Sequence, residues 1–477
     1  MGYGTDTQKK LFYRAPAFVK DAAATFYGGR ERRRRQGVFY DRHFAEAEEF
    51  QWFTTARLQE IQLERVGAFL RATEKSSPWF HELFQKHGFN PANFSSLDSL
   101  RALPVLSKPI LRANLDRIIS PAHRDGDVHW VNTSGTTGFG LRFPETWECF
   151  QRECATRFHN YHCGGIEVGD RWAFCAGHPV ADPARDRPPF WVHDRANNWL
   201  LMSSSHLAEK NLRHYVDELE RFQPDMIGGY PSSVYMLALA NQALGRRVKP
   251  RAIYTSSESL LDFQRAAIEE SFGCAPRSYY GNGERCGFIG ECPHGRLHVR
   301  MEHSLIEFLD DEDRPAAPGQ SARMIVTGFG NPATPLLRYD IGDLAVMAEN
   351  QTCPCGRGGV LLESLDGRVE DYIVTPDGRF AGRLDHLFKD AAQVRLAQIV
   401  QEEVSRVILR VVREPGYGAS DEAAILQEAR LRLGPEIQIA FEYVDDIERS
   451  RTGKFRFVLS KLKGQALYGR KVPAAQI

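Results

Sequence analysis

The chain has 477 residues, of which 61 are Lys or Arg and 61 are Asp or Glu, so its formal net charge at pH 7 is zero. This balance argues against a nucleic-acid coat protein or a polybasic membrane binder, because both gain affinity from accumulated positive charge. Hydrophobic residues make up 42% and charged residues 26%, as in ordinary globular domains, and at about 150 residues per domain the length predicts two or three of them.

Three further features of the sequence indicate where the chain works. No apolar run approaches the roughly 20 residues that a membrane span needs, and the polar start lacks the apolar core of a signal peptide. Nine cysteines, an odd number in a long chain, fit a reducing compartment better than a disulfide framework. We therefore predict a cytoplasmic protein with no nucleic-acid and no membrane partner, and a homodimer is one assembly that this composition allows.

The first 120 residues or so read as mainly helical. Gly88 is a helix-stop signal in this region. The basic run 30–35 is predicted to be a solvated helix face, neutralised in space by Glu46, Glu48 and Glu49. The helical stripe in this region consists of Leu58, Ile61, Val66, Phe69 and Leu70.

From about residue 125 to 345, strand-like runs alternate with helices. A helical pattern over 212–222 ends at Pro224, and a buried strand is expected at 225–230. A helix over 234–244, a strand over 251–258 and a helix over 263–272 repeat the pattern. Such βαβα alternation predicts a layered α/β domain with much parallel sheet, whose ligands bind at loops that follow the carboxyl ends of strands.

The tail from about residue 372 reads as a separate small α+β unit. A strand is expected over 404–413, followed by a helix that begins near Ser420 and ends near Gly434. Strict alternation over 437–443 then predicts a half-buried strand. The expected fold class is therefore α/β, with a large N-terminal multi-layer domain over 1–370, its lead-in 1–120 mainly helical, and a small C-terminal lid domain over 371–477 joined by a hinge.

The segment Asn132-Thr-Ser-Gly-Thr-Thr-Gly-Phe-Gly140 has the composition of a phosphate-binding loop. Glycines let backbone N–H groups approach phosphate oxygens, and the Ser and Thr hydroxyls add side-chain donors. No Lys follows the glycines, which excludes a Walker A loop. Taken alone, the segment is equally compatible with a hairpin turn that binds nothing.

The segment Ser134–Gly138 resembles the signature loop of the adenylate-forming superfamily, which includes acyl- and aryl-CoA ligases, luciferases and peptide-synthetase adenylation domains. The other superfamily motifs follow in the expected order, although Ile341 stands where the third of them usually has Thr. Six matches in register make the resemblance specific. The remaining five are Ser257-Glu258, Tyr280-Gly-Asn-Gly-Glu284, Arg338-Tyr-Asp-Ile-Gly-Asp343, Gly367-Arg-Val-Glu-Asp371 and Arg451-Thr-Gly-Lys454.

Within the superfamily, the chain looks most like the phenylacetate–CoA ligase branch and its capsule-biosynthesis-like members. The likeness covers roughly residues 95–460, and the first 90 residues or so have no counterpart in it. The segments that carry it are Leu103-Pro-Val-Leu-Ser-Lys108, Gly229-Tyr-Pro-Ser-Ser233 and Asp371-Tyr-Ile-Val-Thr-Pro-Asp-Gly378.

This resemblance implies a role for each motif residue in forming an acyl adenylate from ATP. Lys454 would bridge the attacking carboxylate and the α-phosphate, and Glu284 would hold Mg²⁺, a hard cation that prefers oxygen ligands. Asp343 and Arg368 would bind the ribose, and Asp371 would be the hinge on which the small domain turns. Further nucleotide contacts would come from Thr133, Ser134, Gly135, Thr136 (also catalytic), Thr137, Gly138, Ser257, Glu258, Tyr280, Gly281 and Asn282.

The substrate pocket is less determined by the sequence. Tyr-rich walls suit an aryl or otherwise flat acid, and core packing explains any one of these residues equally well. The residues that flank the nucleotide motifs and could line the pocket are Tyr230, Ser232, Ser256 and Tyr279.

Four residues have the composition of a structural zinc site. Cys292, His298, Cys353 and Cys355 would form a tetrahedral Cys₃His set, with His294 as an alternative to His298. They directly follow the motifs of Glu284 and Asp343, and the resemblance adds that relatives in this branch carry zinc here. Buried free thiols are the other interpretation, and the remaining six cysteines show no ligand spacing.

The leading functional interpretation is an AMP-forming ligase that adenylates a carboxylic acid and passes the acyl group to a thiol, most simply coenzyme A. An amine or other small nucleophile is the alternative acceptor. After the hinge, CoA ligases of this branch usually carry a Gly-rich loop, whereas this chain has 375–382, Thr-Pro-Asp-Gly-Arg-Phe-Ala-Gly. A nucleotide-binding protein without catalysis is a third interpretation, and the presence of Lys454, Glu284 and Asp343 together argues against it.

Overall fold

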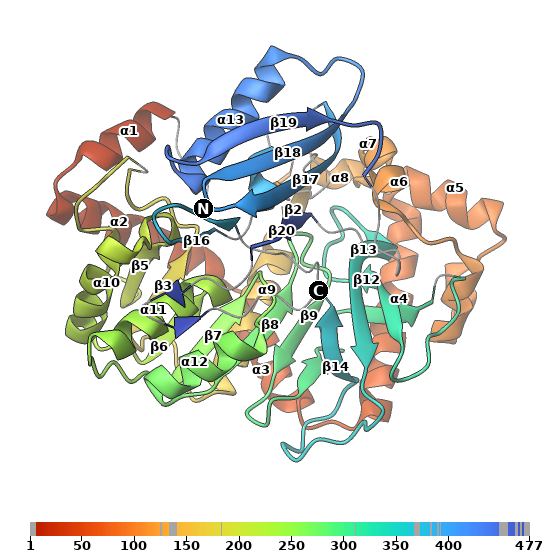
Figure 1. The fold of residues 1–477 in the computed structure, drawn as a ribbon. Coiled ribbons are helices and arrows are strands. Elements are labelled where there is room, and N and C mark those ends of the chain that lie inside the picture. The colour runs from red at the N-terminus through yellow and green to blue at the C-terminus, as the bar shows by residue number, and fades with distance from the viewer. Residues whose placement is uncertain are drawn as a thin grey trace.

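The computed structural model describes residues 6–124, 126–132, 141–182, 184–310, 312–366, 373–381, 384–388, 391, 393–447, 457–462, 466–467 and 470–471. The lead-in is helical, as predicted (Figure 1). Its helices are α1 (Asp6–Arg14), α2 (Ala17–Arg35), α3 (Tyr40–Phe50), α4 (Thr55–Ser76), α5 (Pro78–Lys86), α6 (Lys108–Ala113), α7 (Leu115–Ile118) and α8 (Pro121–Arg124).

Helix α4 carries the predicted apolar stripe. The hydroxyl of Thr54 accepts a hydrogen bond from the backbone N–H of Arg57 and caps the helix. The helix ends at Ser76 because Pro78 disfavours helical geometry at the residue before it. The five stripe residues named above are all buried, which confirms that part of the prediction.

The basic run forms the last turns of α2, and the predicted solvated face holds for the exposed Arg30, Arg32 and Arg33 but not for the half-buried Arg34 and Arg35. The Arg32 guanidinium donates to the carbonyl of Ala196 (3.1 Å), and the Arg35 guanidinium lies 4.5 Å from the ring centroid of Trp199. Glu46 and Glu48, which were expected to neutralise this run, instead pair with Arg65 and His159. One side of α2 packs against the hairpin of residues 191–203, and this packing brings Arg32 and Arg35 into contact with the hairpin.

A twelve-stranded mixed sheet forms the centre of the large domain, in the order β11-β12-β13-β14-β10-β9-β8-β7-β6-β3-β5-β4. The strands β5, β3, β6, β7 and β8 are parallel to one another. A separate hairpin pairs β1 (Val128–Asn132) with β2 (Arg142–Thr146). The strands of the sheet are β3 (Trp172–Ala176), β4 (Trp191–Asp194), β5 (Trp199–Ser203), β6 (Met226–Gly229), β7 (Ala252–Ser256), β8 (Pro276–Gly281), β9 (Phe288–Glu291), β10 (Leu297–Val299), β11 (Leu305–Leu309), β12 (Ser321–Gly328), β13 (Leu336–Met347) and β14 (Leu361–Asp366).

Helices cover both faces of the parallel half. The strand residues Ala173 and Cys175 belong to the core with α10 and α11, whereas Trp172 belongs to the core with α9. The alternation continues only to α12, and the strands from β8 to β14 pair with one another antiparallel. The reason is that all of these connections but the last, 348–360, are shorter than the dozen or more residues that a parallel crossover needs. The covering helices are α9 (Trp147–His162), α10 (Glu209–Phe222), α11 (Pro231–Ala243) and α12 (Asp262–Phe272).

The C-terminal unit has its own four-stranded sheet, drawn in blue in Figure 1. Strands β18 and β19 are parallel with α13 between them, which is the predicted βαβ order. Ile399, Leu409 and Ile425 lie in its core. The elements are β17 (Val394–Glu403), β18 (Arg406–Arg413), α13 (Ala419–Leu433), β19 (Gln438–Tyr443) and β20 (Val458–Ser460), with short pairs β15 (Ile373–Val374) and β16 (Phe380–Ala381), and β21 (Ala466–Leu467) and β22 (Arg470–Lys471).

One arginine connects the two units. The hairpin of β15 and β16 places the buried Arg379 so that its guanidinium donates to the carbonyl of Ser205 (2.7 Å) and to the carbonyl of Arg432 (3.0 Å). The Asp377 carboxylate pairs with the same guanidinium at 2.9 Å. This hairpin stands in the part of the sequence where the resemblance would place the Gly-rich loop of CoA ligases.

A buried histidine near this connection predicts a pH dependence of stability. Burial lowers the pKa of His206 to about 4, and its ring contacts the Ser203 hydroxyl at 2.8 Å. The unfolded state therefore binds a proton below about pH 6.5 that the folded state binds only near pH 4, so this contribution is lost as the pH falls. We expect Tm to drop between pH 7 and pH 5, and to drop less in His206→Gln. An equal drop in Tm in both proteins, measured by circular dichroism, would contradict the assignment of this pH dependence to His206.

Among the described residues, no helix combines the length and the apolar character that crossing a membrane would require.

Candidate active site

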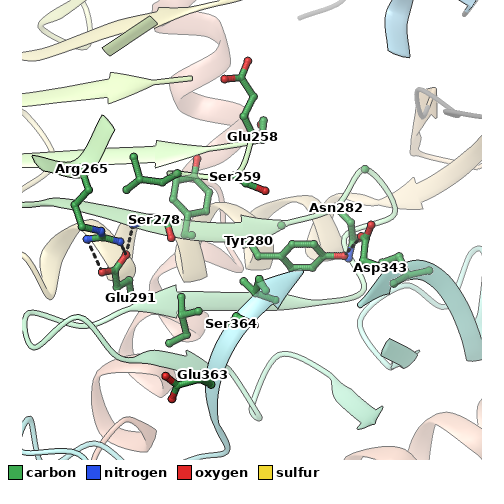
Figure 2. A pocket seen from close by; sticks show the side chains of 18 of the residues that line it. Glu258, Ser259, Arg265, Ser278, Tyr280, Asn282, Glu291, Asp343, Glu363 and Ser364 are labelled. Carbon is green, nitrogen blue, oxygen red and sulfur yellow. Dashed lines mark hydrogen bonds and ion pairs between the residues drawn. The ribbon is translucent and has the colours of Figure 1, made fainter. Parts of the chain in front are cut away.

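A cavity of about 440 Å³ lies at the edge where the parallel strands end (Figure 2). Ser257 and Glu258 directly follow β7, and the turn from Asn282 to Glu284 directly follows β8. Asp343 reaches the cavity from β13. The described walls thus bring together three of the six motif segments. They include Lys108, Ser257, Glu258, Arg265, Ser278, Tyr279, Tyr280, Asn282, Glu284, Glu291, Ile341, Asp343, Glu363 and Ser364.

Tyr280 and Asp343 are joined across the cavity wall. The Tyr280 hydroxyl donates a 2.6 Å hydrogen bond to Oδ2 of Asp343. Burial and the Asp343 charge raise the pKa of Tyr280 well above its ordinary value, so the phenol remains a donor. This hydrogen bond orients the carboxylate of Asp343, the residue that the resemblance implies would bind the ribose.

Glu284 is only 6% exposed, and it is one of the residues that line the cavity. Tyr339 donates from its hydroxyl to Oε1 of Glu284 at 3.2 Å. A carboxylate oxygen is the hard ligand that Mg²⁺ prefers, so the chemistry of this side chain fits a magnesium ligand.

Lys108 is a cavity residue that the sequence analysis did not place in the site. Leu106 adds a short bridge to β13, since its N–H donates to the Arg338 carbonyl (2.8 Å) and its carbonyl accepts from the N–H of Asp340 (3.0 Å). This pairing brings Lys108 to the wall that contains Asp343. The signal was present in the sequence, because Lys108 ends one of the segments that carry the family likeness.

An ion pair between Arg265 and Glu291 was also missed, because it joins helix α12 to strand β9, which 15 residues separate in the sequence. The Arg265 guanidinium lies 2.9 Å from Glu291, which is 4% exposed and also accepts from the N–H of Ser278 at 2.7 Å. Figure 2 shows the pair at one end of the cavity.

We expect Glu291→Ala to lower Tm markedly, because it removes the carboxylate that a partly buried guanidinium and a backbone N–H share, at a cost of about 3 kcal/mol. Thermal melts compare it with Glu269→Ala, which removes an exposed carboxylate from α12. Equal melting temperatures for the two variants would refute the importance of the pair.

The structure separates the residues proposed for the substrate pocket. Tyr279 lines the cavity, and its ring stacks on Phe288 with centroids 5.6 Å apart. Tyr230, Ser232 and Ser256 are not among the residues that line it. The backbone N–H of Ser232 instead donates to the Glu258 carboxylate at 3.2 Å.

Several predicted site residues lie outside the described residues. They are Thr133, Ser134, Gly135, Thr136, Thr137 and Gly138 of the phosphate loop, Arg368 and Asp371 of the hinge motif, and Lys454.

The four predicted metal ligands come together in space. Ligand atoms of Cys292, His298, Cys353 and Cys355 lie within 4.8 Å of one another, with 3.6 Å between Sγ of Cys292 and Sγ of Cys353 and 3.4 Å between Sγ of Cys355 and Nε2 of His298. Two thiolates on one tetrahedral zinc at about 2.3 Å would lie about 3.8 Å apart, so the set fits zinc. His294 is exposed and outside the group.

The imidazole of His298 is already oriented for ligation. Its Nδ1 lies 3.2 Å from the carbonyl of Gly358, which fixes the proton on Nδ1 and leaves Nε2 toward the thiols. The cluster ties β9 and β10 to the connection between β13 and β14. Of the other cysteines, Cys149, Cys154, Cys175 and Cys286 are buried, whereas Cys163 and Cys274 are half-buried.

In sequence, the chain is similar to CapK and to phenylacetate-coenzyme A ligases. The family model described as the CapK C-terminal domain matches residues 373–461. Protein CapK of Staphylococcus aureus is 25% identical over 415 residues, covering 85% of this chain and 90% of that protein. Phenylacetate-coenzyme A ligase of Thermus thermophilus is 24% identical over 328 residues, covering 67% of this chain and 72% of the ligase.

Among solved structures, 2-hydroxyisobutyryl-CoA ligase in the postadenylation state superposes with a TM-score of 0.56 at 16% identity, covering 87% of this chain and 92% of that chain. At this level of identity the superposition speaks for the fold. The chain is thus a relative of CapK and the phenylacetate–coenzyme A ligases, and it has the fold of the adenylate-forming ligases.

Proposed function

We propose that this chain uses ATP to adenylate a small carboxylic acid, releasing pyrophosphate, and then transfers the acyl group to a thiol such as coenzyme A. The observation that carries the proposal is the single cavity at the strand ends, where Ser257–Glu258, Tyr280–Glu284 and Asp343 meet although up to 86 residues separate them. A shared cavity is what a common ligand requires of segments so far apart. Aryl or otherwise flat acids are the substrate class that Tyr279 favours.

Adenylation brings two anions together, the acid carboxylate and the α-phosphate, so the site must supply positive charge and oriented donors. Lys454 would supply the charge, and the hydroxyls and N–H groups of 133–138 would supply donors. Asp343, held by Tyr280, would accept from the ribose hydroxyls. Glu284 would hold Mg²⁺, which neutralises phosphate charge when bound.

We assign residues 1–370 to a large AMP-binding domain and 371–477 to a lid that carries Lys454 and turns about Asp371. In this arrangement, Arg379 anchors the lid to the carbonyl of Ser205. A turn of the lid would break that bond, so Arg379 would favour the position described here. Zinc in the Cys₃His set would serve as a structural staple, because four protein ligands leave no open position.

An amine or other small nucleophile is a second candidate acceptor. The specific observation is the β15–β16 hairpin over 373–381, which is stabilised by the Asp377–Arg379 pair and stands where CoA ligases of this branch usually have a Gly-rich loop. Adenylation is unaffected by this departure, whereas the coenzyme A step depends on it.

Acid-dependent ATP–pyrophosphate exchange across a panel of carboxylic acids tests the first half-reaction. We expect exchange with at least one acid, and coenzyme A or a panel of amines added to that acid then identifies the acceptor. Failure of every acid in a protein that also fails to bind ATP would overturn the proposal.

A further inference from the structure

A buried ion pair connects the arms of the phosphate-loop hairpin to the turn that carries Glu284. Nε of Arg285 lies 2.6 Å from Oε2 of Glu145, and the Glu145 side chain is 1% exposed. Glu145 lies on β2, and 140 residues separate the two partners in sequence. The pair therefore joins two of the motif regions that the sequence keeps far apart.

Glu145 also fixes the other arm of the hairpin. It lies directly opposite His129 on β1, and Nδ1 of His129 is 2.7 Å from Oε1 of Glu145. A carboxylate can only accept, so the histidine donates. Both oxygens of Glu145 are thus engaged, Oε1 by His129 on β1 and Oε2 by Arg285 in the turn after β8.

Arg285 is held by its backbone as well as by its side chain. Its φ of 51° lies in the left-handed region, which is uncommon for a residue other than glycine. Its N–H donates to the carbonyl of Asn282 at 3.1 Å, and its own carbonyl accepts from Nε2 of His303 at 3.2 Å. Such a turn fixes the backbone of the neighbouring Glu284 relative to Glu145, the ion-pair partner of Arg285.

We infer that Arg285 and Glu145 are positioning residues that hold the turn of Glu284 in a fixed place against the β1–β2 hairpin. The inference rests on the proposed function. An ATP complex with Mg²⁺ needs the metal ligand and the phosphate donors in one geometry, since the cation contacts the phosphate oxygens. AMP makes no such demand on the pair, because it lacks the phosphates that the cation bridges.

The test measures dissociation constants by isothermal titration calorimetry for ATP with Mg²⁺, ATP in EDTA, and AMP. In the unaltered chain, Mg²⁺ is expected to tighten ATP binding. In Arg285→Met and Glu145→Gln this benefit should fall about tenfold, with AMP affinity changed less than about threefold. Arg285→Lys, which retains the charge, should recover part of the benefit.

Arg65→Met is the matched control, because Arg65 forms a 2.8 Å ion pair with Glu46 between α3 and α4 and does not line the cavity. It should leave the Mg²⁺ benefit unchanged. If Arg285→Met fails to fold, His129→Ala replaces it, since that imidazole is 40% exposed and its loss should weaken the benefit in the same direction.

The outcomes separate the two claims. Variants that weaken AMP and both forms of ATP equally, or that lower only Tm, would show a merely structural ion pair and overturn the inference while the proposed function stands. If the unaltered chain binds neither ATP nor AMP, the proposed function fails and the inference fails with it.

Discussion

Lys454→Ala is expected to slow acid-dependent pyrophosphate exchange at least about 100-fold, because it removes the cation that would offset the charge developing on the α-phosphate. The ATP dissociation constant should change less than about threefold, since the phosphate loop, Asp343 and Glu284 would still bind the nucleotide. The measurement pairs exchange kinetics, run with an acid found active in the panel, with calorimetric ATP binding.

A lysine elsewhere in the same unit provides the control. Nζ of Lys461 lies 2.7 Å from Glu402, and both side chains are exposed. Lys461→Ala should leave exchange within about twofold, because an exposed pair contributes little. Equal losses of exchange in the two variants would mean that exchange depends on the total positive charge of this unit and not on Lys454 itself. Unchanged exchange in Lys454→Ala would show that Lys454 takes no part in the chemistry.

Loss of the metal is expected to have the largest effect on stability. Cys353→Ser should abolish bound zinc, measured by elemental analysis of the purified protein, and lower Tm by more than about 10 °C, because structural zinc contributes folding free energy directly. This region should be the first to open, since the cluster ties β9 and β10 to the connection between β13 and β14.

Cys274→Ser is the matched variant, because Cys274 is a half-buried thiol outside the cluster. It should retain the metal and melt within a few degrees of the unaltered protein. A zinc content near zero in the unaltered protein, purified without chelator, would show that the four residues are packing groups.

The local elements and the motif segments could be predicted from the sequence, whereas the pairs between them could not. The helices α4, α10, α11 and α12 followed from apolar spacing and from stop signals, because a helix is encoded by neighbours within four residues. The cluster of Cys292, His298, Cys353 and Cys355 followed from ligand chemistry, since few other residue sets suit one metal.

The antiparallel half of the sheet was missed for a physical reason. Strand neighbours are chosen by long-range pairing, and the sequence of β8 to β14 does not state that β14 will lie between β13 and β10. Residues whose roles depend on that pairing were missed with it. Glu291 receives Arg265 and Lys108 reaches the cavity only because of which strands are adjacent.

The place of β14 in the sheet has a consequence for synthesis on the ribosome. Strand β14 (361–366) pairs with β13 on one side and with β10 on the other, so it alone joins β11–β13 to the rest of the described sheet. A nascent chain that has emerged only as far as residue 360 can form both halves of the sheet but cannot unite them. Completion of the cavity, whose wall includes Glu363 and Ser364, therefore awaits one of the last strands of the large domain to leave the exit tunnel.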